Sequence, residues 1–327
     1  MVLSMAFISS HYSNINSAST KSLQYKVCSS NQGRYFSIIE YYKSPVAEFY
    51  CGNDCSLSLI GSHKTHSEFI TAEIHCGDCS LFASPNLWNS AYADGNVNLT
   101  YKNGVVYANV NLSNVMKKSP SIPVVGYPKL VYGYEGWWFP HAGTIQNPHL
   151  VLPMKVSVLP DITSILRYSL WVKEGYILDF SYDIWLTQNP NTKRLAFPDI
   201  ELMIWLHHQG EALPPPFIKM GEVQVPIYVN GSRTTWTFTV YVLPHTGSPT
   251  GWIGVYYLSN KNLEGEVSIP LTFFIKDEFR WINKVFPEIN ESQYYLNSIN
   301  VGMEFNDING RVELGYTLYE WSMTVEY

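Results

Sequence analysis

Apolar and polar side chains alternate with period two in many short segments, and residues 199–206 are the clearest case. One face of this segment is aliphatic, with Ile or Leu at each even position, whereas the other carries Asp199, Glu201, Met203 and Trp205. Successive side chains of a strand point to opposite faces, so the pattern predicts a strand with one core face. A face that combines carboxylates with aromatic rings suits a carbohydrate groove, because sugar rings stack on aromatic side chains and carboxylates transfer protons. A solvent-facing strand residue is the alternative for Glu201.

Two other segments have a similar polar face. In residues 180–186, Ser181, Asp183 and Trp185 share one side. We expect this strand to pair with residues 199–206, and we expect Asp183 to hydrogen-bond Glu201 and hold its position and ionisation. Residues 300–306 alternate again, and Glu304 on their polar side is the candidate proton donor. An ordinary exposed strand glutamate is the alternative for Glu304.

Many strands at close spacing dominate the rest of the chain. Residues 97–101 and 105–112 flank Lys102-Asn103-Gly104, which predicts a hairpin. The other predicted strands are residues 130–134, 150–158, 165–171, 176–187, 201–207, 224–229, 234–243 and 252–258. Close strands without alternating helices indicate an all-β fold, a two-sheet β-sandwich or jelly roll with a concave substrate groove.

One segment has a helical period. Between residues 270 and 286 apolar side chains recur at three- and four-residue steps, with charged residues between them. Pro270 and Pro287 bound this predicted amphipathic helix. A single helix in an all-β chain is expected on the convex face of a curved sheet, which leaves the concave face free for substrate.

Length and charge limit the class of protein. The chain has 327 residues, enough for one large or two modest domains. Its net charge of −6 argues against a partner bound through phosphates, so we expect no nucleic-acid partner. No apolar run is long enough to cross a bilayer. We expect a leader or linker remnant at residues 1–20, an extension of short cysteine-containing strands at 21–79, and a catalytic jelly-roll domain at 80–327.

The amino-terminal quarter bears on the compartment. A short apolar run at residues 1–8 precedes a Ser- and Asn-rich stretch, which fits a trimmed signal or anchor segment or a disordered leader. All the cysteines lie in this quarter: Cys28, Cys51, Cys55, Cys76 and Cys79. We favour disulfides over the alternative of a four-thiolate zinc site. The expected location is therefore extracellular, with the protein secreted or tethered through its amino-terminal segment.

The polar-faced segments resemble glycoside hydrolase family 12, the small β-jelly-roll endoglucanases. The matching segments are residues 181–186, residues 199–206, and Gly302-Met303-Glu304, in the order of the family. Residues 86–89 are similar to its early sugar-binding segment, and residues 126–133 to its Tyr-Pro and Tyr-Gly segment. The resemblance covers residues 80–327. Residues 1–75 have no counterpart, and Met303-Glu304-Phe305-Asn306 departs from the commoner Phe-Glu-Pro-Trp.

The resemblance implies a retaining endo-β-1,4-glucanase that acts on a β-glucan polysaccharide without a cofactor or metal. Glu201 would be the nucleophile, Glu304 the acid/base and Asp183 the residue that positions Glu201. Substrate contacts are expected from Asn86, Trp88, Met203, Trp137, Trp185 and Trp205. We expect a monomer. A hydrolase of the same fold specific for xyloglucan or mixed-linkage glucan is the nearest alternative, and a non-catalytic carbohydrate-binding jelly roll is the next.

Overall fold

The computed structural model describes residues 24–29, 35–40, 47–51, 55–64, 70–75, 79–135, 146–210, 213–246 and 251–327. These residues confirm the all-β class, because they form nineteen strands and a single α-helix. The strands are β1 (Gln24–Ser29), β2 (Tyr35–Glu40), β3 (Ala47–Cys51), β4 (Cys55–Lys64), β5 (Ile70–His75), β6 (Ser80–Ser84), β7 (Ser90–Lys102), β8 (Val105–Lys117), β9 (Lys129–Gly133), β10 (Met154–Lys155), β11 (Asp161–Glu174), β12 (Tyr176–Thr187), β13 (Ile200–His208), β14 (Ile218–Val229), β15 (Ser232–Leu243), β16 (Ile253–Ser259), β17 (Gly265–Pro270), β18 (Tyr295–Asn306) and β19 (Val312–Glu326).

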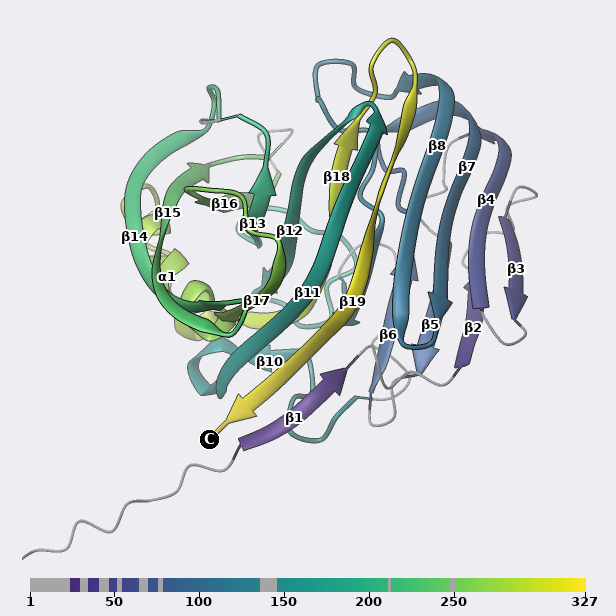
Figure 1. Cartoon of the computed structure of the whole chain (residues 1–327). Coiled ribbons are helices and arrows are strands. Elements are labelled where there is room, and N and C mark those ends of the chain that lie inside the picture. The colour runs from purple at the N-terminus through teal and green to yellow at the C-terminus, as the bar shows by residue number, and fades with distance from the viewer. Residues whose placement is uncertain are drawn as a thin grey trace, which may run out of the picture.

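The strands form one continuous sheet that folds back on itself into two layers (Figure 1). The first layer runs β2-β5-β6-β9-β18-β12-β13-β16-β15, and the second runs β17-β11-β19-β8-β7-β4-β3. Strand β14 pairs with both β15 and β17, so it links the layers. Among the described strands, β13 and β16 are the parallel pair. The result is a sandwich that closes at the β14 end.

The main core lies between the layers. The aliphatic face of β13 has no exposed surface and belongs to this core, as the alternation in residues 199–206 predicts. The layers meet directly where Tyr168 of β11 stacks on Phe180 of β12, with ring centroids 4.1 Å apart. Fully burying a Leu, Ile or Phe side chain stabilises the fold by about 1.5–3 kcal/mol. This burial fixes which face of β12 and β13 is left for other roles.

The helix α1 (Leu271–Ile282) begins directly after Pro270, as predicted, but ends four residues earlier than the periodicity suggests. Its Phe274 packs edge-on against Phe238 of β15 and Tyr257 of β16, with centroids 5.2 and 5.1 Å apart. Tyr257 and Tyr256 are consecutive strand residues and therefore point to opposite faces. Because Tyr256 lies on the face that carries Glu201, α1 covers the opposite, aliphatic face of the same strands.

The strand predicted at residues 150–158 is wrong. Only Met154–Lys155 is a strand there, and a 3₁₀ helix follows at Val156–Val158. Pro153 and Pro160 bracket this segment. Proline has no backbone N–H to donate to a sheet ladder, so an apolar run between two prolines is a poor strand.

The strands before residue 80 continue the two layers. β4 pairs with β7, β5 pairs with β6, and β1 pairs with the end of β19. Leu57, Leu59 and Ile74 have no exposed surface and join the main core.

The structure bears on two of the cysteines. Cys55 and Cys79 are each disulfide-bonded. The side chains of Cys28, Cys51 and Cys76 lie outside the described residues, as does the leader at 1–20, so the connectivity stays a prediction. Within the described part of the chain, no helix has the length and apolar character that a membrane span requires.

Candidate active site

The pairing of β12 with β13 brings two of the predicted site residues to one face. The expected pairing of these two strands is confirmed, with Asp183 opposite Met203 and Trp185 opposite Glu201. Side chains directly opposite each other in an antiparallel pair share a face. Asp183 and Glu201 therefore lie on the same side of the sheet, away from the main core.

The other neighbour of β12 adds the third carboxylate. In the pairing of β12 with β18, Asp183 lies opposite Asn300, and Asp179 lies opposite Glu304. Glu304 thus shares the face of Asp183 and Glu201, and β12 runs between the two glutamates. The three carboxyls that the sequence singled out come together on three adjacent strands.

Glu201 is half-buried and receives two hydrogen bonds from the side of β16. Trp252 Nε1 donates to its Oε2 at 3.0 Å, and Tyr256 Oη donates to the same oxygen at 2.9 Å. Gly254 lies opposite Glu201 in the parallel pair. A Cβ at Gly254 would lie 2.6 Å from Tyr256 Oη, so only glycine leaves room for the tyrosine to fold over it and reach Glu201.

The two glutamates differ in what surrounds them. Burial raises the pKa of Glu201, and the hydrogen bonds from Trp252 and Tyr256 oppose that rise. Burial raises the pKa of Glu304 well above its usual range, and the charge of Asp179 raises it further. Donors favour the ionised form, and neighbouring anions favour the protonated form. The site therefore favours a charge on Glu201 and a proton on Glu304, the division of roles that a carboxylate nucleophile and an acid require.

The hydrogen bond expected between Asp183 and Glu201 is absent from the contacts of these two described residues. Asp183 Oδ2 instead accepts from Trp185 Nε1 and Asn300 Nδ2, each at 3.3 Å. The direct cross-strand partner of Glu201 is Trp185, which leaves Asp183 in a diagonal position. Burial, followed by the negative charge of Glu201, raises the pKa of Asp183. The charge of Glu201 therefore acts on Asp183, and no hydrogen bond between the described atoms joins the two side chains.

A buried ion pair completes the polar cluster. Lys129 on β9 and Glu135 are both buried and in direct contact, and Asn300 Nδ2 donates to Glu135 Oε1 at 3.2 Å. The positive charge of Lys129 lowers the pKa of both Asp183 and Glu201. Lys129 thus places one cation beside several acids that would otherwise repel one another.

Two of the predicted substrate-binding residues are buried. Trp185 is 3% exposed and meets Trp252 edge-on at 5.4 Å, and Trp205 is 8% exposed and meets Tyr256 at 6.1 Å. Both rings pack against other aromatic side chains, and the expected contact of Trp185 and Trp205 with substrate stays a prediction. Met203 and Trp205 are buried in a second apolar cluster, separate from the main core. This cluster also contains Tyr241, Leu243, Tyr256 and Leu258.

The remaining predicted substrate contacts are not decided by the structure. Trp88 and Asn86 are half-buried just before β7. The carbonyl of Trp88 accepts from Lys118 Nζ at 2.9 Å, and that of Asn86 accepts from Tyr127 N at 2.8 Å. Their contact with a sugar stays a prediction, and Trp137 lies outside the described residues.

Several residues of the cluster were not predicted. Asp179 was missed although it continues the alternation of Ser181, Asp183 and Trp185 by one step. Trp252, directly before β16, and Tyr256 on β16 alternate in the same way, but nothing local shows that β16 lies beside β13. Lys129 and Glu135 carry no sequence signal, since only the fold brings them to the carboxylates.

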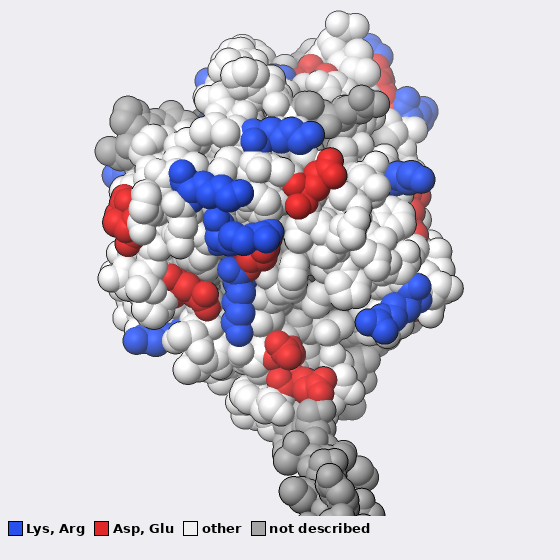
Figure 2. Space-filling model, turned by 90° about the vertical axis from the view of Figure 1, so that its left-hand side faces the viewer, with Lys and Arg blue, Asp and Glu red and all other residues white. Residues whose placement is uncertain are grey.

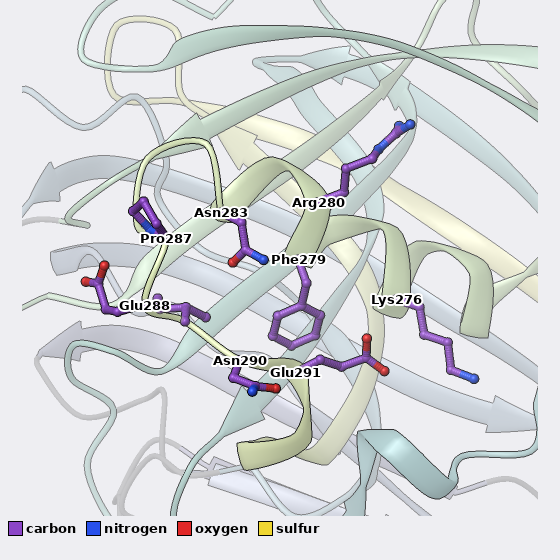
Figure 3. A pocket seen from close by; sticks show the side chains of 9 residues that line it. Lys276, Phe279, Arg280, Asn283, Pro287, Glu288, Asn290 and Glu291 are labelled. Carbon is purple, nitrogen blue, oxygen red and sulfur yellow. The ribbon is translucent and has the colours of Figure 1, made fainter.

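A surface pocket elsewhere does not belong to this site. It lies beside α1 and is lined by Lys276, Phe279, Arg280, Asn283, Pro287, Glu288, Ile289, Asn290 and Glu291 (Figure 3). Acidic and basic side chains are interspersed on that side of the molecule (Figure 2). Because α1 covers the face opposite Glu201, this pocket is separated from the carboxylates by the sheet.

The sequence matches a known family over most of its length. Residues 80–326 match the model of glycosyl hydrolase family 12. The chain belongs to this family. It is therefore a glycosidase. The matched range includes all the acids described above: Glu135, Asp179, Asp183, Glu201 and Glu304. A comparison with curated proteins found no match.

Solved structures of family 12 enzymes share the fold. A native family 12 xyloglucanase from Bacillus licheniformis has 16% identity and a TM-score of 0.55, with 82% of this chain and 99% of that chain covered. The endoglucanase cel12A from Rhodothermus marinus has 18% identity and a TM-score of 0.52, with 76% and 92% covered. Endoglucanase 3 from Trichoderma harzianum has 16% identity and a TM-score of 0.50, with 87% and 100% covered. At these identities the likeness concerns the fold alone.

Proposed function

We propose that this family 12 enzyme is a retaining endo-β-1,4-glucanase, with Glu201 as nucleophile and Glu304 as acid/base. The observation that carries the proposal is the pair of glutamates on one sheet face with opposite environments. Glu201 accepts hydrogen bonds from Trp252 and Tyr256, whereas Glu304 faces another carboxyl. A non-catalytic carbohydrate-binding protein would have no use for this arrangement.

The strand geometry supports a double displacement. Strands on either side of a common neighbour lie about 10 Å apart. Two glutamates that lean toward each other over β12 can bring their carboxyl groups to the separation of about 5–5.5 Å that retaining hydrolysis needs. Glu201 attacks the anomeric carbon while Glu304 protonates the leaving oxygen, and Glu304 then removes a proton from the water that releases the sugar.

The substrate is proposed to lie in a concave groove of a jelly roll, across the face formed by β13, β12 and β18. Trp88 would stack on a sugar ring at some distance from the reacting bond. The disulfide-bonded Cys55 and Cys79 support an exported enzyme, because disulfides persist in oxidising compartments.

The preferred β-glucan is a separate question, since specificity arises from contacts along the groove rather than from the carboxylates. The structures similar to this one include a xyloglucanase as well as endoglucanases. Xyloglucan is therefore the second candidate substrate. Initial rates on carboxymethyl cellulose, mixed-linkage glucan and xyloglucan at equal polymer concentration would rank the three.

Proton NMR of fresh product tests the mechanism. We expect the β-anomer first, because two inversions at the anomeric carbon restore its configuration. Glu201→Gln should lose glucan cleavage and keep glucan binding. The exposed strand residue Glu222 offers the control Glu222→Gln, which should retain full activity. Release of the α-anomer first, or full activity in Glu201→Gln, would show that the assigned pair is wrong.

A further inference from the structure

Asp179 is a buried carboxyl that the proposed reaction does not use. Its side chain has no exposed surface, and it lies opposite Glu304 in the pairing of β12 with β18. Ser181 Oγ donates to Asp179 Oδ1 at 2.6 Å. Asp179 Oδ2 is buried and has no partner of ordinary hydrogen-bond geometry among the described N–H and hydroxyl groups, although the backbone N–H of Glu304 also interacts with this carboxyl. This oxygen needs a partner, because an unsatisfied buried acceptor is costly.

The partner in reach is the carboxyl of Glu304. The two residues lie directly opposite each other on adjacent strands, where the Cβ atoms are about 4.5–5.5 Å apart, so their carboxyl groups can meet. Two carboxyls can share a hydrogen bond only when one of them carries a proton. The donor from Ser181 favours a charge on Asp179, whereas no described N–H or hydroxyl group contacts the Glu304 carboxyl. The proton therefore belongs on Glu304, directed toward Asp179 Oδ2.

We propose that Asp179 is a positioning residue that holds the acid/base Glu304 in place and keeps it protonated before reaction, an inference that rests on the proposed function. Glu304 is half-buried and open to substrate, whereas Asp179 is fully enclosed and reaches substrate only through Glu304. Asp179 thus extends the pH range in which Glu304 can act as an acid.

The total charge of Glu201, Asp179 and Glu304 supports this arrangement. Once the pair of Asp179 and Glu304 has given up its first proton, Glu201 and Asp179 are anionic before reaction and Glu304 is neutral. When Glu201 forms its bond to the anomeric carbon, the bond to the leaving oxygen breaks and that oxygen takes the proton of Glu304. Glu201 is then a neutral ester, and Glu304 and Asp179 are anionic. The three carboxyls hold two negative charges in both states, so charge moves within the cluster and does not accumulate.

Other titratable groups face the pair from each neighbouring element. On β12 this group is Asp183, and on β13 the groups are Glu201 and His208, of which His208 lies opposite Asp179. The others are Tyr256 on β16, Lys129 on β9 and Tyr127, which precedes β9. His208 Nε2 contacts the carbonyl of Ser259 at 2.7 Å, and its Nδ1 is buried without a described partner. Tyr127 Oη donates to the carbonyl of Ser181 at 3.0 Å. Glu201 and Asp183 repel a charge on Glu304 and act in the same direction as Asp179.

Burial and charge agree with the geometry. Burial raises the pKa of Asp179 to about 7, and the hydrogen bond from Ser181 opposes that rise. The pKa of Glu304 is raised first by burial and next by Asp179. The two carboxyls therefore titrate as a pair, and this pair gives up its first proton at a higher pH than an isolated carboxyl would.

The direct test is a pH titration of the full-length enzyme by carboxyl ¹³C NMR with labelled glutamate, in which Glu304→Gln identifies the Glu304 resonance. Asp179→Asn removes the neighbouring charge and offers an amide donor, and both changes favour ionised Glu304. We expect the Glu304 midpoint to fall by about 1–2 pH units. Ser181→Ala should shift it less, in the same direction, because Asp179 then competes better for the proton. The control Glu278→Gln, a buried carboxyl on α1, should not shift it.

Kinetics give a second measurement that a merely structural role would not change. On β-glucan, the alkaline limb of kcat/KM in Asp179→Asn should move to lower pH by the same amount. On an aryl cellobioside whose leaving group needs no proton, Asp179→Asn should stay within about threefold of the parent enzyme, because acid catalysis contributes little there. An unchanged Glu304 midpoint in both Asp179→Asn and Ser181→Ala would overturn the inference. Absence of any glucan cleavage by the parent enzyme would overturn the proposed function and leave the titration to decide the pairing.

Discussion

At the scale of single residues, Glu201 depends on two donors that both come from the β16 side. Trp252 and Tyr256 bind the same oxygen, Oε2, and each stabilises the ionised form of Glu201. A hydrogen bond to a charged group contributes about 1.5–3 kcal/mol. Loss of one donor should therefore be visible in both the rate and the pH profile.

Tyr256→Phe removes one of these donors and keeps the ring. Because a donor lowers the pKa of a carboxylate, its loss raises the pKa of Glu201, and the acidic limb of the pH profile should move to higher pH. We expect kcat/KM to fall about tenfold to a hundredfold. The matched control is Tyr241→Phe, because Tyr241 lies opposite Tyr256 in β15 and is buried in the same apolar cluster. Equal effects in the two variants would mean that the hydroxyl of Tyr256 has no special role.

Sequence alternation predicted the face that carries the three carboxyls better than it predicted the contacts on it. Period two alone places Glu201, Asp183 and Glu304 on polar faces, and the structure puts these faces together. The partner of Asp183 could not be predicted, because a register shift of two residues, which keeps the same face, decides whether it lies opposite Glu201 or diagonal to it. The fate of Trp185 and Trp205 could not be predicted either, since alternation gives the face of a side chain but not what covers it.

At the scale of elements, α1 carries a buried acid with no partner. Glu278 has no exposed surface, and neither carboxyl oxygen has a hydrogen-bond partner among the residues that the structure describes. Burial raises its pKa well above the usual range, and the charges of Glu291 and Asp277 raise it further. The folded chain therefore keeps a proton on Glu278 that the unfolded chain releases above its ordinary pKa of about 4.5.

This difference in bound protons determines whether the free energy of unfolding rises or falls with pH. Where the unfolded state binds fewer protons than the folded state, the free energy of unfolding decreases as pH rises. Glu278→Gln resembles the protonated form at every pH, so we expect a higher Tm at pH 8 and little change at pH 5, by differential scanning calorimetry at both pH values. A lower Tm for the variant at pH 8 would show that the charged form is stabilised in the fold.

The disulfides belong to a different element, the strands before residue 80. Cys55 lies on β4, and Cys79 lies directly before β6. Reduction should lower the Tm, because the cross-links restrict the unfolded chain. Activity below the new Tm should be retained, since the carboxylates lie on β12, β13 and β18. Elemental analysis that finds one zinc per chain would contradict the expectation that these cysteines form disulfides.

Elements were predictable where local chemistry decides them. The hairpin of β7 and β8 follows from Asn103-Gly104, and the helix follows from its period and from Pro270. Strand β17 was missed because its six residues run directly into the helix, where the apolar spacing fits both. Residues 150–158 show the reverse error, since an apolar run looked like a strand despite its prolines.

At the scale of the whole molecule, the order of strands could not be predicted from the sequence. The chain leaves β13 and returns to it in parallel as β16 only after β14 and β15 have formed a hairpin. Likewise β18 reaches β12 across more than a hundred residues. Such pairings depend on the complementarity of distant surfaces, for which a single sequence has no local signal. The sandwich class was predictable, and the sheet that joins its two layers was not.

One consequence of the continuous sheet concerns contact between molecules. Among the described strands, each layer ends in a strand from the first 51 residues, β2 in one layer and β3 in the other. The match to the family starts at residue 80. A chain that began there would leave β6 and the thirteen-residue β7 as open edges, and open edges add strands from other molecules.

We therefore expect removal of residues 1–79 to cause concentration-dependent self-association, measured by size-exclusion chromatography with light scattering. A monomeric truncated chain at high concentration would show that other features keep the edges apart. The strands before residue 80 pair with both β6 and β7, and on this expectation they leave no room there for a strand from another copy of the chain.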